Sequence, residues 1–304
     1  MLNSKLLTCF LAVVTHRTLT AAADELCITQ PALSKSLRKL EEQLGVPLFK
    51  RTAAGMVPTA YGATLAHRAR LIQLESQRAH DEILSMKDGG VGMLNVGAGP
   101  LWSVHLLPDV VAELAQTHPS LRVRVVPGVL STLLPQLLRG ELDIICAALD
   151  FPDHDDIEKE YLIDSSHVFL AHRSHPLHQA DEVSDVELSR CRFVGPHNDY
   201  AVLERMKRYF ALRGLDTPGF AAEADSLEIL LSLVATGQFV ATQSHQVLPH
   251  ARKLGIDVLP TAQGIWRFRG GLARRRHPVA LPLIDLFGDC MRRHVAARES
   301  SGGL

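Results

Sequence analysis

The residues that most constrain what this chain can fold into are 29–44, whose pattern is that of a helix with one apolar and one polar face. Leucines recur there at spacings of four, three and four, which places Leu33, Leu37, Leu40 and Leu44 on one buried face. Thr29 can cap the start of this helix, and Pro31 falls in the first turn, where its missing N–H costs nothing. Gly45 then supplies a C-terminal stop.

The opposite face of this helix begins with hydrogen-bonding and cationic side chains, namely Gln30, Ser34, Lys35 and Arg38. They gather at the N-terminal end, which is the end that a recognition helix presents to base edges in DNA. Two amphipathic segments, 7–14 and 19–26, precede it, and the connection to Thr29 is as short as a helix-turn-helix requires. This combination favours a DNA-reading unit over three ordinary core helices.

A short hairpin, or wing, is predicted after this helix, between Val46 and Pro58, with Lys50 and Arg51 placed beside phosphates. The charge distribution agrees with this expectation. Residues 1–70 carry nine Lys or Arg and four Asp or Glu, a balance of +5, whereas the rest of the chain carries 23 against 29, a balance of −6. A basic head on an acidic body suits a head that contacts nucleic acid.

Several motifs in this head match a known family. They are Phe10-Leu11-Ala12-Val13-Val14, Leu19-Thr20, Ala22-Ala23, Gln30-Pro31-Ala32-Leu33-Ser34, Leu40-Glu41, Leu44-Gly45-Val46, Leu48-Phe49 and Arg51. Through them the chain closely resembles the N-terminal domain of LysR-type transcriptional regulators, and its length and layout fit that family from end to end. We expect a winged helix-turn-helix whose DNA contacts come from Gln30, Pro31, Ala32, Ser34, Lys35, Arg38, Lys50 and Arg51.

A long helix is predicted from Thr59 to about Asp88. Apolar and small residues repeat along it with the spacing of a coiled-coil seam, and the candidate dimerisation positions are Leu65, Ala69, Ile72, Ser76, Ala79 and Ile83. The alternative is a single amphipathic helix lying on its own domain. Because two DNA-reading heads are needed for two half-sites, we favour pairing of subunits, as in the linker helix of the family.

From Met93 the pattern becomes strand, helix, strand, which predicts parallel β-α-β units with both faces covered. The resemblance to the family implies a periplasmic-binding-protein-like (type 2) α/β fold with two subdomains and a cleft between them. The expected fold class is therefore α/β behind an N-terminal unit dominated by helices. The expected domains are 1–58 for DNA binding, 59–91 for the linker helix and 92–304 for regulation, with subdomain I at 92–161 and 267–304 and subdomain II at 162–266.

A small-molecule effector is expected in that cleft, because ligands of parallel sheets bind at the carboxyl ends of the strands. The candidate effector-binding residues are Gly99, Pro100, Leu101, Trp102, Ser103, Gly128, Val129, Ser131, Val194, Pro196, Ser226 and Thr242. Relatives often place a Ser or Thr in the first of these loops to hold a carboxylate, whereas this chain has Pro100, Leu101 and Trp102 there. This departure points to a flatter or more apolar ligand, and Trp102 can either pack at a helix start or stack on the ligand.

Three other chemistries find little support. His172, His175 and His178 recur every three residues, but no Cys or carboxylate ligand stands beside them, so we expect no metal. Cys191 could report on oxidants in a thiol-based regulator, yet it has no cysteine partner nearby in sequence. No nucleophile elbow, phosphate loop or Ser-His-Asp spacing predicts an enzyme or a cofactor.

A secreted solute-binding protein is the competing interpretation, because Lys5, an apolar run and Ala21-Ala22-Ala23 imitate a signal peptide. His16 and Arg17 interrupt that run, and the basic helix at 29–44 would have no purpose on a secreted protein. Five cysteines, an odd number with no CxxC, favour reduced thiols in the cytoplasm. No apolar run approaches the roughly 18 residues that span a bilayer.

The sequence thus predicts a cytoplasmic, dimeric or tetrameric regulator that binds double-stranded promoter DNA and responds to a small-molecule effector. From the family resemblance we expect activation of target promoters, which brings in RNA polymerase as a partner, and no membrane.

Overall fold

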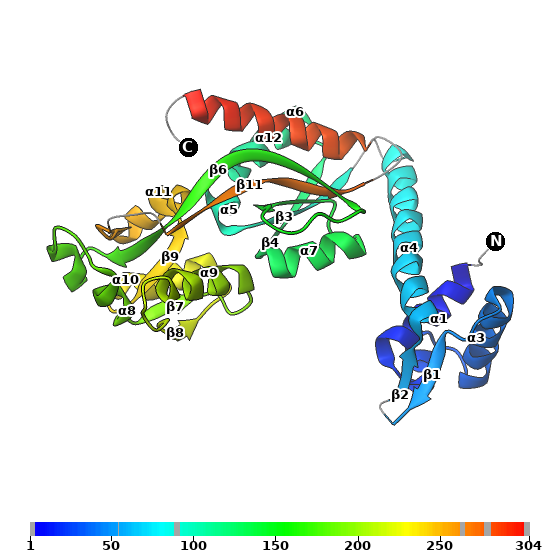
Figure 1. Cartoon of the computed structure of the whole chain (residues 1–304). Helices are drawn as coiled ribbons and strands as arrows, with labels where there is room; N and C mark the ends of the chain where they lie inside the picture. Colours follow the sequence, from blue (N-terminus) through cyan, green and yellow to red (C-terminus); the bar gives the residue numbers. More distant parts are fainter. Residues whose placement is uncertain (1–3, 54, 88–91, 262–264, 277–280, 301–304) are drawn as a thin grey trace. The chain divides into compact units, whose positions relative to one another are not determined.

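The structure is a computed structural model that describes residues 4–53, 55–87, 92–261, 265–276 and 281–300. The chain separates into two compact units, Met1–Gly89 and Gly90–Leu304, each with its own core. Figure 1 shows the order of the elements in both units. Among the described helices, none is long and apolar enough to cross a membrane.

The first unit, called the head, is a winged helix-turn-helix followed by a long helix. Its elements are α1 (Ser4–His16), α2 (Leu19–Glu25), α3 (Gln30–Leu44), β1 (Phe49–Thr52), β2 (Gly55–Pro58) and α4 (Ala60–Lys87). Buried side chains from all four helices, together with Leu48 just before β1, form one core, in which Phe10, Leu33 and Leu40 are completely buried. The strands β1 and β2 pair in antiparallel register as the predicted wing.

The boundaries of α3 follow from its sequence. Thr29 accepts a hydrogen bond from the backbone N–H of Ala32, and Pro31 stands in the first turn. Gly45 ends the helix with a φ of 69°, a left-handed conformation that glycine adopts without strain. The prediction for Leu44 is wrong: its side chain is 38% exposed, because it lies at the end of the helix beyond the last turn covered by the core.

The long helix α4 packs its first part onto the head. Thr59 accepts a hydrogen bond from the N–H of Gly62 and so begins the helix as predicted. Ala66 and Ala69 are buried in the head's own core, and Leu65 packs against the same core. The assignment of Ala69 to a seam between subunits is therefore wrong, since its own chain covers it.

The second unit, called the effector unit, is built on one mixed sheet of nine strands in the order β4-β3-β5-β11-β6-β9-β7-β8, with β10 paired to β6. The strands are β3 (Met93–Ala98), β4 (Arg122–Pro127), β5 (Ile144–Ala148), β6 (Ile157–His172), β7 (Phe193–Gly195), β8 (Phe220–Glu223), β9 (Val240–Ser244), β10 (Ile256–Val258) and β11 (Trp266–Arg275).

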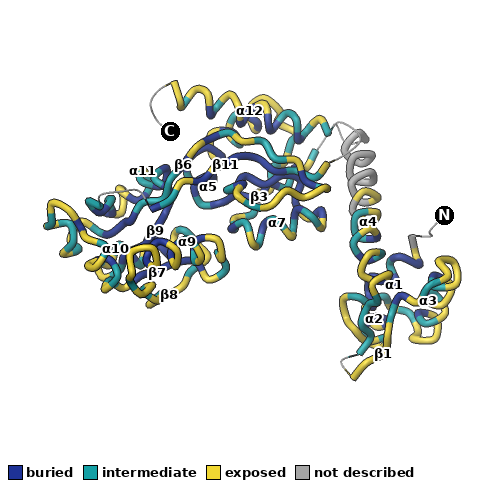
Figure 2. Tube along the Cα trace, in the orientation of Figure 1, coloured by how far each residue is buried: buried dark blue, intermediate teal, exposed yellow. Residues whose placement is uncertain are grey.

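Helices cover both faces of this sheet (Figure 1). They are α5 (Pro100–His105), α6 (Leu107–Thr117), α7 (Leu130–Arg139), α8 (Asp185–Ser189), α9 (Tyr200–Ala211), α10 (Leu227–Ala235), α11 (Leu248–Ala251) and α12 (Pro282–Ser300), with short 3₁₀ turns at Pro176–Gln179, His245–Val247 and Arg252–Leu254. Side chains of α6 and α12 share one core, and those of α7 form another with β5 and β11. Figure 2 shows the difference in burial along the sheet: the inner strands β5 and β9 are almost entirely buried, whereas the edge strands β4 and β8 are not.

The two long strands β6 and β11 join the two halves of the effector unit. β3, β4 and β5 are parallel to one another, as are β7, β8 and β9, which agrees with the predicted β-α-β pattern. β6 and β11 instead run antiparallel to their neighbours, so the prediction of parallel pairing does not hold for them. Their pairing shifts register at Gly270 and Gly271, and a Cβ on Gly271 would lie 1.9 Å from the carbonyl oxygen of Glu160, which only glycine avoids.

Candidate functional sites: a polar helix face and a cleft

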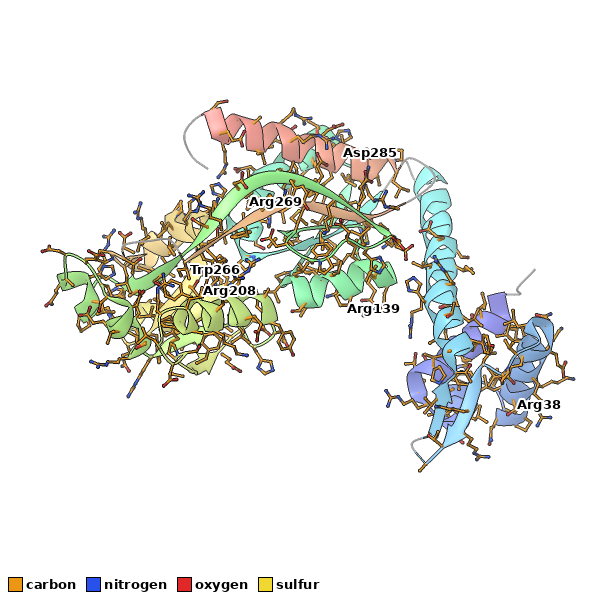
Figure 3. The ribbon with its side chains drawn as sticks, viewed as in Figure 1. Arg38, Arg139, Arg208, Trp266, Arg269 and Asp285 are labelled. Atoms are coloured by element: carbon orange, nitrogen blue, oxygen red, sulfur yellow. The ribbon has the colours of Figure 1, made fainter. Side chains whose placement is uncertain are left out.

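The exposed face of α3 carries the candidate DNA-contacting residues. Gln30, Pro31, Ala32, Lys35 and Arg38 are exposed, and Ser34 is half-buried beside them. Figure 3 shows Arg38 projecting outward from this helix. Neither Lys35 nor Arg38 has an ion-pair partner among the described residues. These side chains are thus held by a rigid helix, with their donors available to an external acceptor.

The wing adds two cations to the head. Lys50 and Arg51 are exposed on β1, opposite Val57 and Met56 of β2. Because successive side chains of a strand point to opposite faces, Lys50 and Arg51 lie on different sides of the two-stranded ribbon. They can therefore contact two separated phosphates but cannot act as one paired site.

A cleft in the effector unit encloses a cavity of about 100 Å³. Seven of the twelve candidate effector-binding residues line it: Gly99, Pro100, Leu101, Trp102, Val129, Pro196 and Thr242. They stand at the ends of β3, β4 and β7 and along β9, which is where the strand-end rule places a ligand. Leu230 of α10 and Phe268 of β11 add to the apolar part of the wall.

The remaining five candidates have other surroundings. Ser103 donates its hydroxyl to the carbonyl of Gly99, and Ser226 caps α10 by accepting the N–H of Ile229. Val194 is buried in the core, and the Cα of Gly128 packs against α7. Ser131 donates to the backbone carbonyl of Asn198, so it connects the two sides of the cleft without lining the cavity.

Polar residues that the sequence did not indicate also line the cleft. Asp150, after β5, pairs with Arg205 of α9, with 2.9 Å between Oδ2 and Nη2 and each side chain 27% exposed. Asp199 and Asp225, before α9 and α10, join them. Asp199 caps α9 and Asp225 directly precedes the cap of α10, so both have a turn-like sequence context. No local signal brings Asp150 and Arg205 together, because they lie 55 positions apart in the sequence.

The lining is acidic on balance. It holds three carboxylates, and among the described lining residues Arg205 is the one Lys or Arg. Asp225 accepts hydrogen bonds from the N–H and the side-chain amide of Asn198, which keeps this carboxylate at the cleft. Burial raises the pKa of Asp199, although the N–H groups of Val202 and Ala201 oppose that effect. These carboxylates would repel an organic anion, and the guanidinium of Arg205, which could bind such an anion, is already paired with Asp150.

His167 of β6 lies in the cleft wall as a neutral ring. Burial lowers its pKa to about 3, and the nearby Arg205 acts in the same direction. Its Nδ1 lies 2.9 Å from the hydroxyl oxygen of Thr242, and its ring stacks on Trp266 with 4.7 Å between centroids. The ring therefore offers the cavity an apolar face and a hydrogen-bonding edge, without charge.

Trp102 forms part of the cavity wall and is completely buried. A Cβ on Gly270 would lie 3.1 Å from Cζ2 of the Trp102 indole, so β11 has no side chain at the point where the ring packs against it. Within the described residues, the indole N–H has no hydrogen-bond acceptor. Trp102 packs in the core and also lines the cleft, and stacking on a ligand stays a prediction.

His172, His175, His178 and Cys191, which the sequence suggested for metal or thiol chemistry, each have a separate hydrogen-bond partner. His172 pairs with the hydroxyl of Ser174, His175 accepts the N–H of Leu177, and the ring of His178 reaches the carbonyl of Ala171, so the three rings have separate partners. Cys191 bonds to the carbonyl of Glu187, and burial raises the pKa of its thiol, which disfavours the reactive thiolate. Among the described residues, all five cysteines are free thiols.

Comparison with known proteins adds the following. Residues 87–296 match the family described as LysR substrate binding domain, and residues 4–63 match the bacterial regulatory helix-turn-helix protein, lysR family. The HTH-type transcriptional regulator GalR of Pseudomonas putida is 28% identical over 287 residues, covering 93% of this chain and 72% of its own. The DNA-binding transcriptional dual regulator OxyR of Escherichia coli K12 is 28% identical over 260 residues, covering 85% of each chain.

Solved structures show the same fold. Full-length CbnR complexed with its target DNA has a TM-score of 0.66 at 21% identity, over 96% of this chain and all of the other. A full-length OxyR variant from Pseudomonas aeruginosa has a TM-score of 0.62 at 23% identity, over 96% and 95% of the two chains.

Proposed function

The chain belongs to the LysR family of transcriptional regulators, with a DNA-binding helix-turn-helix and an effector-binding domain, and on this premise we propose which of its residues read DNA and what the cleft binds. Gln30 and Ser34 read base edges, while Lys35, Arg38 and the wing cations Lys50 and Arg51 hold phosphates. The observation that carries this assignment is the set of accessible donors at the N-terminal end of α3, where Lys35 and Arg38 have no ion-pair partner in the part of the chain that the structure describes.

The DNA assignment is tested on the full chain. Fluorescence anisotropy is measured with the duplex that precedes its own coding region, with a scrambled duplex of equal length, and at several salt concentrations. We expect tighter binding to the first duplex at every salt concentration, together with a decrease in affinity for both as salt rises. Equal affinity for the two duplexes would contradict the proposal.

For the effector, we propose an apolar body with a neutral or cationic head. The cavity wall is largely apolar through Leu101, Trp102 and Phe268, and three carboxylates outnumber the one paired guanidinium. A buried, unpaired negative charge in this cleft would cost more than the apolar contacts return.

Three probes with the same ring and different heads test this charge preference: benzylamine, benzyl alcohol and benzoate. We expect thermal stabilisation of the protein in that order, because at equal concentrations the ligand with the lower dissociation constant stabilises the folded state more. If benzoate stabilises the protein most, the proposed charge preference is wrong.

Effector binding would control DNA binding by favouring one arrangement of the two subdomains over another. The Asp150–Arg205 pair and the Ser131–Asn198 hydrogen bond connect the two sides of the cleft, so a ligand that separates them changes that arrangement. The coupling cannot exceed the difference in the ligand's affinity for the two states. We propose that the outcome is activation of promoters in the cytoplasm, with RNA polymerase as a further partner and no enzymatic step.

We propose a dimer or tetramer whose subunits pair through the outer part of α4. Ile72 is 46% exposed and Ser76 is exposed, so both are available, whereas Leu65 and Ala69 pack on the head. The side chains of Ala79 and Ile83 lie outside the described residues. The limits 1–58, 59–91 and 92–304 serve as the proposed domains, with the two subdomains meeting along β6 and β11.

A further inference from the structure

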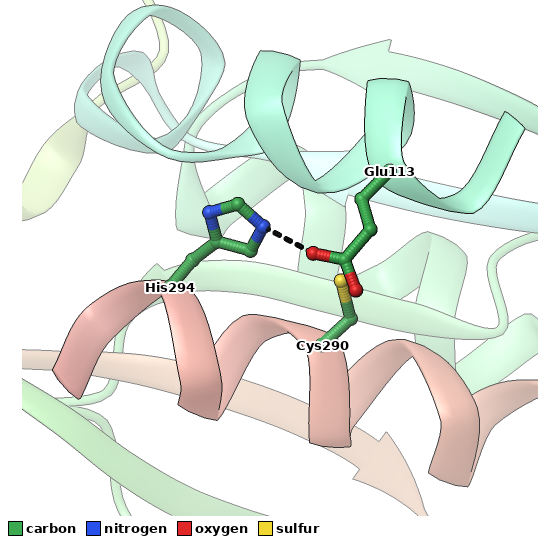
Figure 4. Close-up of side chains that lie close together, drawn as sticks. All are labelled: Glu113, Cys290 and His294. Atoms are coloured by element: carbon green, nitrogen blue, oxygen red, sulfur yellow. Dashed lines mark hydrogen bonds and ion pairs between the residues drawn. The ribbon is translucent and has the colours of Figure 1, made fainter. Parts of the chain in front are cut away.

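Three metal-ligating side chains meet between α6 and α12, away from the residues that line the cleft. They are Glu113 of α6 with Cys290 and His294 of α12, and one ligand atom from each lies within 4.8 Å of the others (Figure 4). In the described part of the chain, this is the one group of this composition and closeness.

The positions of these residues suit coordination of one ion. Cys290 and His294 are four residues apart on one helix, so their side chains share a face. Nε2 of His294 already lies 2.8 Å from Oε2 of Glu113. In a tetrahedral zinc site the ligand atoms are about 3.3–3.6 Å apart, because the bonds to zinc are about 2.0–2.3 Å long. Side-chain rotations that move the ligand atoms by about an ångström would therefore complete the site.

The three side chains of the cluster are buried to different extents, as a metal site with one open side requires. The side chain of Cys290 is completely buried, whereas those of His294 and Glu113 are 24% and 34% exposed. An ion can therefore enter from the exposed carboxylate and imidazole, and a water molecule can take the fourth position. The sulfur ligand lies on the dry side, where a metal–thiolate bond competes least with water.

The charged side chain beside this cluster is Arg293, which is compatible with a bound cation. Arg293 binds one oxygen of Glu113, while the other oxygen faces His294, so the arginine can keep the carboxylate oriented while it coordinates. The same arginine is a positive charge that opposes a cation. The thiol of Cys290 is buried beside the Glu113 carboxylate, so a cation that binds there has to displace the thiol proton.

We propose that Glu113, Cys290 and His294 bind one divalent cation of the zinc class and that this ion fastens α12 to α6. On binding, the Cys290 sulfur gives its lone pair to the metal and its proton to solvent, with no change of oxidation state. The soft sulfur and the imidazole select zinc or cobalt over magnesium and calcium, which prefer oxygen ligands. Because α6 follows α5 directly, and Trp102 of α5 lines the cleft, the ion would also rigidify one wall of the cleft.

The test uses the full chain, stripped of metal, without an affinity tag and in a non-thiol reductant. Co²⁺ is titrated while the absorbance is recorded, because a thiolate–cobalt bond produces a near-ultraviolet charge-transfer band. We expect this band to saturate at one Co²⁺ per chain and to be lost when Zn²⁺ is added. We also expect Zn²⁺ to raise the melting temperature, because the assembled site binds it more tightly than the unfolded chain does.

Variants assign the site. Cys290→Ser should abolish the band, and His294→Ala and Glu113→Gln should weaken Co²⁺ binding by at least about tenfold. Cys191→Ser is the matched control, since it removes a half-buried thiol elsewhere and should leave the titration unchanged. His294→Ala alters a partly exposed side chain, so it keeps the proposal testable if Cys290→Ser fails to fold.

No band in the wild-type protein would overturn the proposal. A band that persists in Cys290→Ser, or one that disappears in Cys191→Ser, would overturn it equally. Unchanged affinity in a folded His294→Ala variant, verified by circular dichroism, would remove His294 and with it the three-ligand site.

Discussion

The polar face of α3 and the cleft of the effector unit differ in where their residues come from and how far they are buried. The candidates on α3 lie between Gln30 and Arg38 and are mostly exposed, whereas those of the cleft come from segments between Gly99 and Phe268 and include buried side chains. Substitution on α3 should therefore change binding with little effect on folding. Substitution in the cleft should change both, because the residues that would contact a ligand also hold the sheet together.

The largest effect should follow from Trp102→Ala. Removing a fully buried indole should lower the free energy of unfolding of the effector unit by about 3–5 kcal/mol. Both tryptophans of the chain lie in this unit, so the remaining Trp266 reports its unfolding in urea by fluorescence. Tyr200→Ala, which alters a side chain that is 65% exposed, is the control and should change stability by less than about 0.5 kcal/mol. Equal losses in the two variants would contradict the assignment of Trp102 to the core.

The head should behave in the opposite way. Gln30→Ala should weaken binding to the cognate duplex by about 1–3 kcal/mol and reduce the preference over a scrambled duplex, because a side chain that reads a base edge is lost. The free energy of unfolding of this variant should stay within about 0.5 kcal/mol of the wild-type value, since Gln30 is exposed. Binding isotherms on both duplexes measure the first effect and urea unfolding the second.

Arg38→Ala is the matched control for that experiment. A phosphate contact carries no sequence information, so this variant should bind both duplexes more weakly by a similar factor and should reduce the salt dependence by about one unit of slope. If Gln30→Ala also lowers both affinities equally, its role is positioning and not base recognition.

The same contrast explains how much could be predicted from the sequence. The boundaries of α3 and the wing were predictable because periodicity, the Thr29 cap and Gly45 are local signals. Seven cleft residues were found because strand ends are also local. Asp150, His167 and Arg205 could not be found. The pairing of β11 with both β5 and β6 brings the first two near each other, and Arg205 reaches Asp150 from α9. Such long-range packing leaves no mark in nearby residues. The exposure of Leu44 and the burial of Ala69 depend on which element covers them, which periodicity does not specify.

The pH dependence of stability should show whether His167 lies in a buried cleft wall or in an exposed one. Its pKa is lowered from 6.5 to about 3 in the folded state, so below pH 6.5 the unfolded chain binds a proton that the folded chain does not. The contribution of the neutral His167 ring to the free energy of unfolding is therefore fully present above pH 6.5. It is lost as the pH falls towards 3, by up to about 1.4 kcal/mol per pH unit. Urea unfolding of the wild type and of His167→Gln between pH 7 and pH 5 measures the difference in slope.

His197 provides the control of opposite sign. The hydrogen bond that this exposed ring donates to the Glu223 carboxylate raises the pKa of His197, so its contribution to stability is present below pH 6.5 and is lost as the pH rises through the raised pKa. His197→Gln should therefore shift the pH dependence in the other direction or leave it unchanged. A wild-type slope that His167→Gln does not reduce would mean that the ring is solvated in the folded protein.

Within the cleft, a small effect on stability should come from Asp150→Asn, although its effect on binding should be informative. The Asp150–Arg205 pair is partly exposed, so its loss should cost no more than about 1 kcal/mol. The substitution leaves the guanidinium of Arg205 in the cleft without its ion-pair partner, which gives an organic anion a partner that the wild type withholds. Benzoate should therefore raise the melting temperature of Asp150→Asn more than that of the wild type, and benzylamine should raise it less. If benzoate stabilises the two proteins equally, then Arg205 does not reach the ligand, and the acidic balance of the lining does not determine what the cleft accepts.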